Sequence, residues 1–230
     1  MIQLTKAIIT ALQWEADIII KNYWLKEVKK VGSLQIYEWT KKSDTNEDEK
    51  IVLLISGEGK IHSAFATTYL CENYNPDKIV NIGIVWNLNH DQLKIWDVMI
   101  PNTFVQHDFY IPPELDFSKS QREAIFLEYA IWEEYNLEKF SLHLSGICAT
   151  WDQFIDNDDL WAEIRETYWA DIVDMECYSI LSILKAYDVL DKTLVIKAVS
   201  DGANNESKDT TMTNLEYAMN NAFAILDFSL

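Results

Sequence analysis

Three carboxylates stand where apolar segments end or predicted helices begin. Glu15 follows the apolar segment Ala7–Leu12, Glu176 opens a helix in the string DMECYS, and Asp201 ends the string TLVIKAVSD. Taken singly, an acidic side chain at a helix start is usually a cap or a dipole partner. Strands that run in the same direction would bring all three to one edge of a sheet. Because general acid–base catalysis needs at least two carboxylates in different environments, the pattern indicates that kind of chemistry.

The string SGEGK, Ser56 to Lys60, is a second possible ligand site. It follows a predicted strand and opens a predicted helix, so its backbone N–H groups could face a polar or anionic ligand. It is not a Walker loop, because Leu54 stands where the first glycine is needed and Ile61 stands where Ser or Thr should bind magnesium. An ordinary tight turn between a strand and a helix fits the string as well.

The sequence lacks the motifs of a metal site and of a covalent nucleophile. The chain has no GxSxG string for a serine nucleophile. No i, i+4 or HxH spacing of a zinc site occurs among the four histidines, His62, His90, His107 and His143. The three cysteines are far apart in the sequence, without CxxC spacing, and are expected to be reduced, buried thiols: Cys71, Cys148 and Cys177.

Charge excludes further classes of partner. A formal net charge of −18 would repel a phosphate backbone or an anionic membrane surface. No apolar run reaches the roughly eighteen residues that cross a bilayer, so we expect a cytoplasmic chain that binds neither nucleic acid nor membrane. The only arginines, Arg122 and Arg165, lie in predicted helices, so the forks that usually hold a free phosphate are missing.

Short apolar runs alternate with longer amphipathic stretches, which is typical of an α/β layer domain with a mixed sheet. No repeat, linker or break in composition divides the chain, so residues 1–230 are predicted to form one domain, with a solvated loop at Lys41–Lys50. The predicted strands are Ala7–Leu12, Leu34–Trp39, Ile51–Ser56, Lys78–Gly83, Val98–Pro101, Leu142–Thr150, Ile172–Val173 and Thr193–Val199. The predicted helices are Glu15–Tyr23, Lys60–Asn73, Ser120–Tyr135, Asp158–Tyr168, Glu176–Tyr187 and Asn214–Phe228.

Eight strings, taken together and in order, resemble the nucleoside phosphorylase and nucleosidase superfamily. The closest resemblance is to its hydrolytic branch, the 5′-methylthioadenosine/S-adenosylhomocysteine nucleosidases. Each string alone is a modest signal, but their collinear sum covers nearly the whole chain. The strings are ALQWEAD from Ala11, SGEGKIHSAFATTYL from Ser56, NIGIVWNLN from Asn81, IWDVMIP from Ile95, HD at His107, DQFI from Asp152, VDMECYSI from Val173 and VSDGAN from Val199.

The resemblance implies a three-layer αβα sandwich with a twisted mixed β-sheet, assembled as a homodimer. It implies hydrolysis of the N-glycosidic bond of a purine nucleoside without metal or organic cofactor. Asp201, held by Ser200, would protonate N7 of the departing purine, and Glu15 would deprotonate the attacking water. The substrate itself would be bound by Met175, Glu176, Phe154 and Ile155, with Gly83 and Trp86 beside the ribose.

Tryptophan stands where the resemblance leads us to expect glycine. The chain has only six Gly, whereas an average composition would supply roughly sixteen, and it has nine Trp. Trp86, Trp96 and Trp151 occupy clear glycine positions of the resembling strings, and Trp169 occupies a plausible one. Our hypothesis is that the natural gene reads UGA as glycine and that this sequence inserts tryptophan there. The alternative is a divergent pocket lined by indoles.

Two other functions stay open at this stage. A phosphate-dependent nucleoside phosphorylase of the same superfamily is weakened by the missing arginines. A non-catalytic nucleoside-binding protein is made plausible by the indoles at Trp86 and Trp151, which would crowd substrate and water. The substituent at the 5′ carbon of the substrate is not determined by these motifs.

Overall fold

The computed structural model describes residues 2–41, 47–109, 123–129, 140–153, 158–201 and 207–229. Its strands are β1 (Ile2–Thr10), β2 (Lys26–Val31), β3 (Leu34–Lys41), β4 (Glu47–Ile55), β5 (Lys78–Asn87), β6 (Val98–Met99), β7 (Thr103–Gln106), β8 (Ile125–Phe126), β9 (Leu142–His143), β10 (Ile147–Thr150), β11 (Ile172–Asp174) and β12 (Thr193–Asp201). Its helices are α1 (Gln13–Tyr23), α2 (Lys60–Tyr74), α3 (Asp158–Tyr168), α4 (Cys177–Ala186) and α5 (Ser207–Ser229), with a 3₁₀ turn at Leu190–Lys192.

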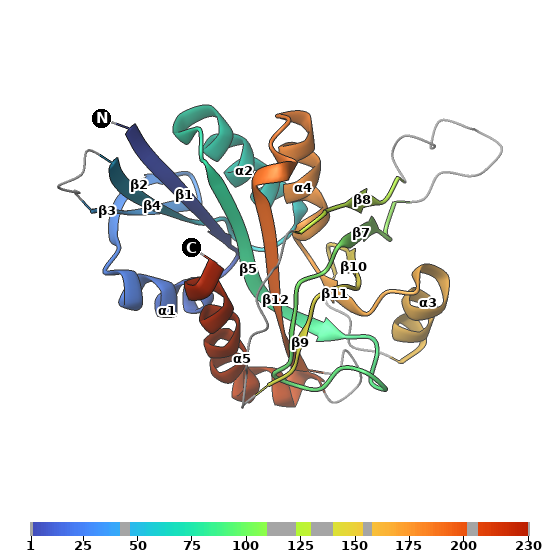
Figure 1. Cartoon of the computed structure of the whole chain (residues 1–230). Coiled ribbons are helices and arrows are strands. Elements are labelled where there is room, and N and C mark those ends of the chain that lie inside the picture. Colours follow the sequence, from blue (N-terminus) through green and yellow to red (C-terminus); the bar gives the residue numbers. More distant parts are fainter. Residues whose placement is uncertain are drawn as a thin grey trace.

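These strands form one twisted, mixed sheet (Figure 1). Its main path runs β2-β3-β4-β1-β5-β11-β10-β7-β8, and β12 joins it by pairing with β5 and β6. Strands β4, β1, β5 and β12 are parallel, whereas β11 runs antiparallel to β5. The carboxyl ends of the four parallel strands therefore lie at one edge of the sheet.

Helices cover both faces of this sheet, which confirms the predicted three-layer αβα sandwich (Figure 1). Side chains alternate along β1: Ala7 and Ile9 pack toward α2 and α4, while Ile8 packs toward α1 and α5. The same alternation along β4 sends Leu54 to one face and Leu53 to the other. Two apolar layers thus pack against the two faces of the parallel strands. No helix in the described part of the chain is long and apolar enough to cross a membrane.

Several predicted elements differ from the observed ones. The helix predicted at Ser120–Tyr135 is wrong within residues 123–129, where Ile125–Phe126 instead pairs with β7 as strand β8. The predicted strand Leu142–Thr150 is divided into β9 and β10. A Cβ atom at Gly146 would lie 2.6 Å from the sulfur of Met99, so the chain passes this point only without a side chain.

Strands β2 and β4 also differ from the prediction. Strand β4 begins at Glu47, inside the loop predicted at Lys41–Lys50, because it pairs with β1 along its whole length. Strand β2 was not predicted, since its sequence KEVKKV is almost entirely exposed and lacks an apolar face. Lysine-rich edge strands of this kind protect a sheet from pairing with other chains.

Three tryptophans in the described ranges have a left-handed backbone, which is rare for a bulky residue. Trp24 (φ 52°) follows α1, Trp169 (φ 58°) follows α3, and Trp96 (φ 77°) lies in the turn before β6. In that turn the Asp97 N–H donates to the Lys94 carbonyl at 3.1 Å, so Trp96 holds the position that needs glycine in a type II turn. Other non-glycine residues with positive φ in the described ranges are Asn75 and Asp188.

Candidate active site

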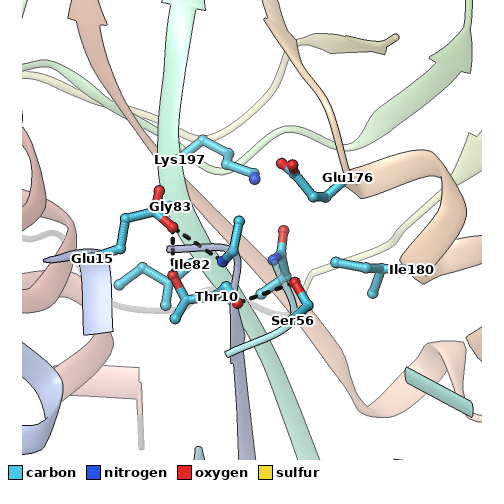
Figure 2. A pocket seen from close by; sticks show the side chains of 10 residues that line it. Thr10, Glu15, Ser56, Ile82, Gly83, Glu176, Ile180 and Lys197 are labelled. Carbon is cyan, nitrogen blue, oxygen red and sulfur yellow. Dashed lines mark hydrogen bonds between the residues drawn. The ribbon is translucent and has the colours of Figure 1, made fainter. Parts of the chain in front are cut away.

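A small cavity of about 10 Å³ lies beside the carboxyl ends of β1 and β4 (Figure 2). A space of this size holds about one water molecule. Two of the three carboxylates singled out in the sequence, Glu15 and Glu176, border it. Its full lining is Thr10, Ala11, Glu15, Ser56, Asn81, Ile82, Gly83, Glu176, Ile180 and Lys197.

Glu15 is buried and its carboxylate is held in one orientation by four hydrogen bonds. Oε2 accepts from the Thr10 hydroxyl at 2.7 Å and from the N–H groups of Ala11 and Leu12 at 3.1 and 3.0 Å. Oε1 accepts from the Ile84 N–H at 3.0 Å. The turn between β1 and α1 and the middle of β5 therefore present the same carboxylate to the cavity.

Gly83 keeps the space next to this carboxylate open. A Cβ atom at position 83 would lie 2.9 Å from Glu15 Oε1, closer than carbon and oxygen can approach without a shift. The observed position of the Glu15 carboxylate therefore requires a residue without a side chain at position 83, and Figure 2 shows the two residues side by side. A direct contact between Gly83 and a ribose stays a prediction.

A buried ion pair, which was not predicted, lies across the cavity from Glu15. Lys197 Nζ lies 3.0 Å from Asp174 Oδ2, and both side chains are almost fully buried. Burial lowers the pKa of Lys197, but the surrounding thiols and carboxylates outweigh it and hold the pKa well above its ordinary value. Lys197 is therefore a permanent positive charge at the cavity, and its ammonium points toward the Glu176 carboxylate (Figure 2).

Glu176 links the cavity to the SGEGK turn. Its Oε1 accepts the Gly59 N–H at 2.8 Å, so the N-terminus of α2 faces a carboxylate of the protein itself. Burial and the charge of Asp174 raise the pKa of Glu176 to about 8, although Lys197 and the Gly59 N–H act in the opposite direction. Glu176 therefore carries its proton at neutral pH.

We expect the raised pKa of Glu176 to make the protein less stable at alkaline pH. The folded state binds this proton up to pH about 8, whereas the unfolded state releases it near the ordinary value of 4.5, so stability falls as pH rises through this window. Glu176→Gln removes the ionisation and should be more stable than the parent at pH 9, by on the order of a few kcal/mol. Urea unfolding at pH 6 and pH 9 measures this, and an equal difference at both pH values would contradict it.

Asp201 and Ser200 end strand β12 and are fully buried. The Ser200 hydroxyl lies 3.2 Å from Asp201 Oδ2 and 3.3 Å from the Val85 carbonyl, so it can donate to either. The pairing of β12 with β5 shifts between Val199 and Asp201, and this shift sets Asp201 opposite Trp86. The geometry agrees with the expected Ser200–Asp201 contact, while the acid role of Asp201 stays a prediction.

The remaining predicted binding residues lie elsewhere or outside the described ranges. The Trp86 side chain is 8% exposed and packs with Leu88, Ala149 and Val173, and it is not among the described residues that line the cavity. Met175 packs partly buried against the same cluster. The two expected purine contacts, Phe154 and Ile155, lie outside the described residues.

Two of the cysteines meet in space although they are distant in the sequence. The thiols of Cys148 and Cys177 and the carboxylate of Asp174 lie within 4.8 Å of one another, which is the arrangement of a possible metal site. Burial raises the pKa of both thiols, which disfavours the thiolate that a metal requires. The Asp174 carboxylate already accepts from Thr150 at 2.6 Å and pairs with Lys197. We therefore interpret the cluster as part of the core behind the cavity.

Sequence reasoning missed Lys197 and Asp174. A lysine inside the apolar string TLVIKAVSD was a usable signal, because a lysine is almost never fully buried without a partner. Its partner lies in a different strand, which periodicity does not reveal. Arg165 donates to the carbonyl groups of Trp169 and Ala170, so it is engaged at the end of α3. Arg122 lies outside the described residues.

Known proteins resemble this chain over nearly its whole length. The family model described as the phosphorylase superfamily matches residues 5–229. A curated 5′-methylthioadenosine/S-adenosylhomocysteine nucleosidase of Bacillus cytotoxicus is 29% identical over 215 residues, 87% of each chain, and one of Bacillus thuringiensis is 28% identical over 217 residues, also 87% of each chain.

Solved structures share the fold at lower identity. Futalosine hydrolase of Helicobacter pylori has a TM-score of 0.84 at 21% identity, covering 97% of this chain and 96% of the other. The 5′-methylthioadenosine/S-adenosylhomocysteine nucleosidase of Neisseria meningitidis, in complex with methylthio-immucillin-A, has a TM-score of 0.79 at 21% identity, covering 95% and 94%. The family match and the fold lead to one conclusion: the chain belongs to the phosphorylase superfamily.

Proposed function

We propose that this protein hydrolyses the N-glycosidic bond of a purine nucleoside such as 5′-methylthioadenosine or S-adenosylhomocysteine and releases adenine. The observation that carries the proposal is the water-sized cavity between Glu15 and Glu176. Glu15 is fixed by four hydrogen bonds with Oε1 beside the open face of Gly83, which suits a group that binds and deprotonates a water molecule. The names of the Bacillus relatives support the same reaction.

The charges of the site suit such a bond cleavage. Breaking the glycosidic bond builds positive charge on the sugar and negative charge on the base. Glu15 takes a proton from the water molecule while the water oxygen bonds to the anomeric carbon. As the bond from that carbon to the purine breaks, Asp201 gives a proton to N7 of the departing purine. Glu176, beside Met175, accepts hydrogen bonds from the ribose hydroxyls as a carboxylate, so it releases the proton that it holds in the free protein. Phe154 stacks on the purine, and the backbone of Ile155 reads its edge.

Futalosine is a second candidate substrate. The structure of futalosine hydrolase has the higher TM-score of the two compared above, although both are 21% identical to this chain. The assay should therefore compare substrates that differ in the substituent at the 5′ carbon. A phosphorylase is less well supported, because Arg165 is already engaged by backbone carbonyls at the end of α3.

One assay separates these functions. We expect the purified protein to release adenine from 5′-methylthioadenosine in buffer without phosphate, at a rate that added phosphate leaves unchanged. Release only with phosphate would indicate a phosphorylase, and binding without turnover would indicate a nucleoside-binding protein. Faster cleavage of futalosine than of 5′-methylthioadenosine would assign the second substrate.

We also propose that the protein acts as a cytoplasmic homodimer, with neither nucleic acid nor membrane as a partner. The resemblance of its motifs to the nucleosidases and its net charge of −18 support this. Light scattering of the purified protein should give twice the mass of one chain. A monomer mass at the concentration of the activity assay would contradict the dimer.

A further inference from the structure

Three segments that are distant in the sequence meet at the N-terminus of α2, next to the cavity but outside its lining. They are the SGEGK turn before α2, the segment after β7 that contains Asp108, and the segment after β10 that contains Asp152. The side chain that touches both of the other segments is that of Lys60. The function proposed above gives Lys60 no role, so its contacts need a separate explanation.

Lys60 holds two carboxylates with one ammonium group. Its Nζ donates to Asp108 Oδ2 in a short ion pair and lies 3.6 Å from Asp152 Oδ2. The Lys60 and Asp108 side chains are only 17% and 13% exposed, so water screens this pair less than an ordinary surface pair. Desolvation by burial raises the pKa of Asp108, but the hydrogen bonds from Lys60 and Gln106 lower it below its ordinary value, which keeps the carboxylate charged.

Backbone groups close the arrangement. The Lys60 N–H, in the first turn of α2, donates to Asp152 Oδ1 at 2.7 Å, and the Asp152 N–H lies 3.4 Å from Asp108 Oδ2. A Cβ atom at Gly59 would lie 2.9 Å from Asp152 Oδ1, so glycine allows this close approach. Asp152 is thus fixed by the helix N-terminus and by the ammonium group together.

The same turn reaches the cavity in the other direction. Gly59, the residue before Lys60, donates its N–H to Glu176 Oε1 at 2.8 Å. Two consecutive N–H groups therefore bind two carboxyl groups that belong to different parts of the site. Asp152 precedes Phe154 and Ile155 by two and three residues, and these are the proposed purine contacts. Glu176 is the proposed ribose contact.

We propose that Lys60 is a positioning residue that fixes Asp152, two residues before the proposed purine contact Phe154, relative to the carboxyl group of Glu176. The inference rests on the proposed nucleosidase function and deepens it. Lys60 does not line the cavity, and the function proposed above gives it no contact with the substrate. It acts through Asp108 and Asp152, so its loss should weaken binding of the purine more than it slows cleavage of the bond.

The test compares kcat and KM of Lys60→Met, Asp108→Asn and the double variant. We expect each single change to raise KM for 5′-methylthioadenosine about 10- to 100-fold, because losing one or two contacts of hydrogen-bond strength changes affinity by that order. The fall in kcat should be smaller, and the double variant should be no worse than the worse single one. Lys60→Arg, which keeps the charge, should recover most of the loss.

Lys50→Met is the matched control. Lys50 forms an ion pair with Glu38 at 2.8 Å and is similarly exposed, at 20%, but neither residue lines the cavity. This variant should keep the parental KM. If Lys60→Met or Asp108→Asn fails to fold, the thermal midpoint shows it and Lys60→Arg is compared with Lys60→Gln instead. An unchanged KM in a folded variant without the Lys60 charge would overturn the inference, whereas an inactive parent would count against the proposed function.

Discussion

Replacement of Asp201 by asparagine is expected to slow adenine release by about 10²- to 10⁴-fold, the usual contribution of a general acid. The introduced amide has the shape of the carboxyl group but has no proton of suitable acidity for N7. Asp201 is fully buried at the end of β12, where the neutral side chain fits the same space. The loss should therefore appear in kcat, while the thermal midpoint and the binding of adenine stay close to those of the parent.

Ser200→Ala is the control for this prediction. It removes the hydroxyl that lies 3.2 Å from Asp201 Oδ2 but leaves the carboxyl group in place. We expect a loss of about fivefold, the effect of one misplaced hydrogen bond of roughly 1 kcal/mol. Initial rates of adenine release, measured with both variants at saturating substrate, decide the question. A fully active Asp201→Asn protein would exclude Asp201 as the acid.

The α/β class of the fold could be predicted from the sequence because short apolar runs alternate with longer amphipathic stretches, whereas the three-layer sandwich was an implication of the family resemblance. In the structure Ala7 and Ile9 face one helical layer and Ile8 faces the other, as the two-residue repeat of a strand requires. The short strand at Ile125–Phe126 could not be predicted in this way. It exists only because β7 lies beside it, and two residues are too few for any periodicity.

In the candidate site, too, residues at element boundaries could be predicted, whereas residues that depend on distant partners could not. Glu15 and Glu176 could be identified because each stands next to an element boundary in the chain. Lys197 was missed because its role depends on Asp174, which reaches it from another strand. The proximity of Cys148 and Cys177 was missed for the same reason, since strand β10 and helix α4 are connected only through the folded sheet.

The positions that require glycine could be predicted only in part, and the backbone angles show which predictions the structure supports. The motifs indicated glycine at Trp96 and Trp169, and both have positive φ. Trp24 was not singled out, yet its left-handed backbone lets the Leu25 N–H return to the Ile20 carbonyl at 3.1 Å, a helix ending that favours glycine. Trp86 and Trp151 do not have positive φ. The backbone therefore supports the glycine hypothesis at three of the eight tryptophans that lie in the described residues.

We expect the double change Trp24→Gly and Trp169→Gly to stabilise the protein. A Cβ in the left-handed region costs about 1–2 kcal/mol, and the extra freedom of glycine in the unfolded chain offsets about 0.5–1 kcal/mol of the gain. The two indoles are 74% and 75% exposed, so little apolar contact is lost. A net gain of about 1–2 kcal/mol should raise the thermal midpoint by roughly 2–8 °C for a chain of this length.

Alanine at the same two positions separates the backbone effect from the loss of the indoles. Trp24→Ala with Trp169→Ala keeps Cβ in the left-handed region and should give little or no gain. Trp161→Gly should instead destabilise the protein by about 3–5 kcal/mol or more. Trp161 lies in helix α3, packs against the buried cluster that contains Leu88, and donates from Nε1 to the Asn87 carbonyl at 3.2 Å. If the glycine and alanine pairs had equal midpoints, these sites would not require glycine. The hypothesis of a recoded gene further expects UGA codons at most of the nine tryptophan positions, and UGG codons at most of them would refute it while leaving the stability prediction intact.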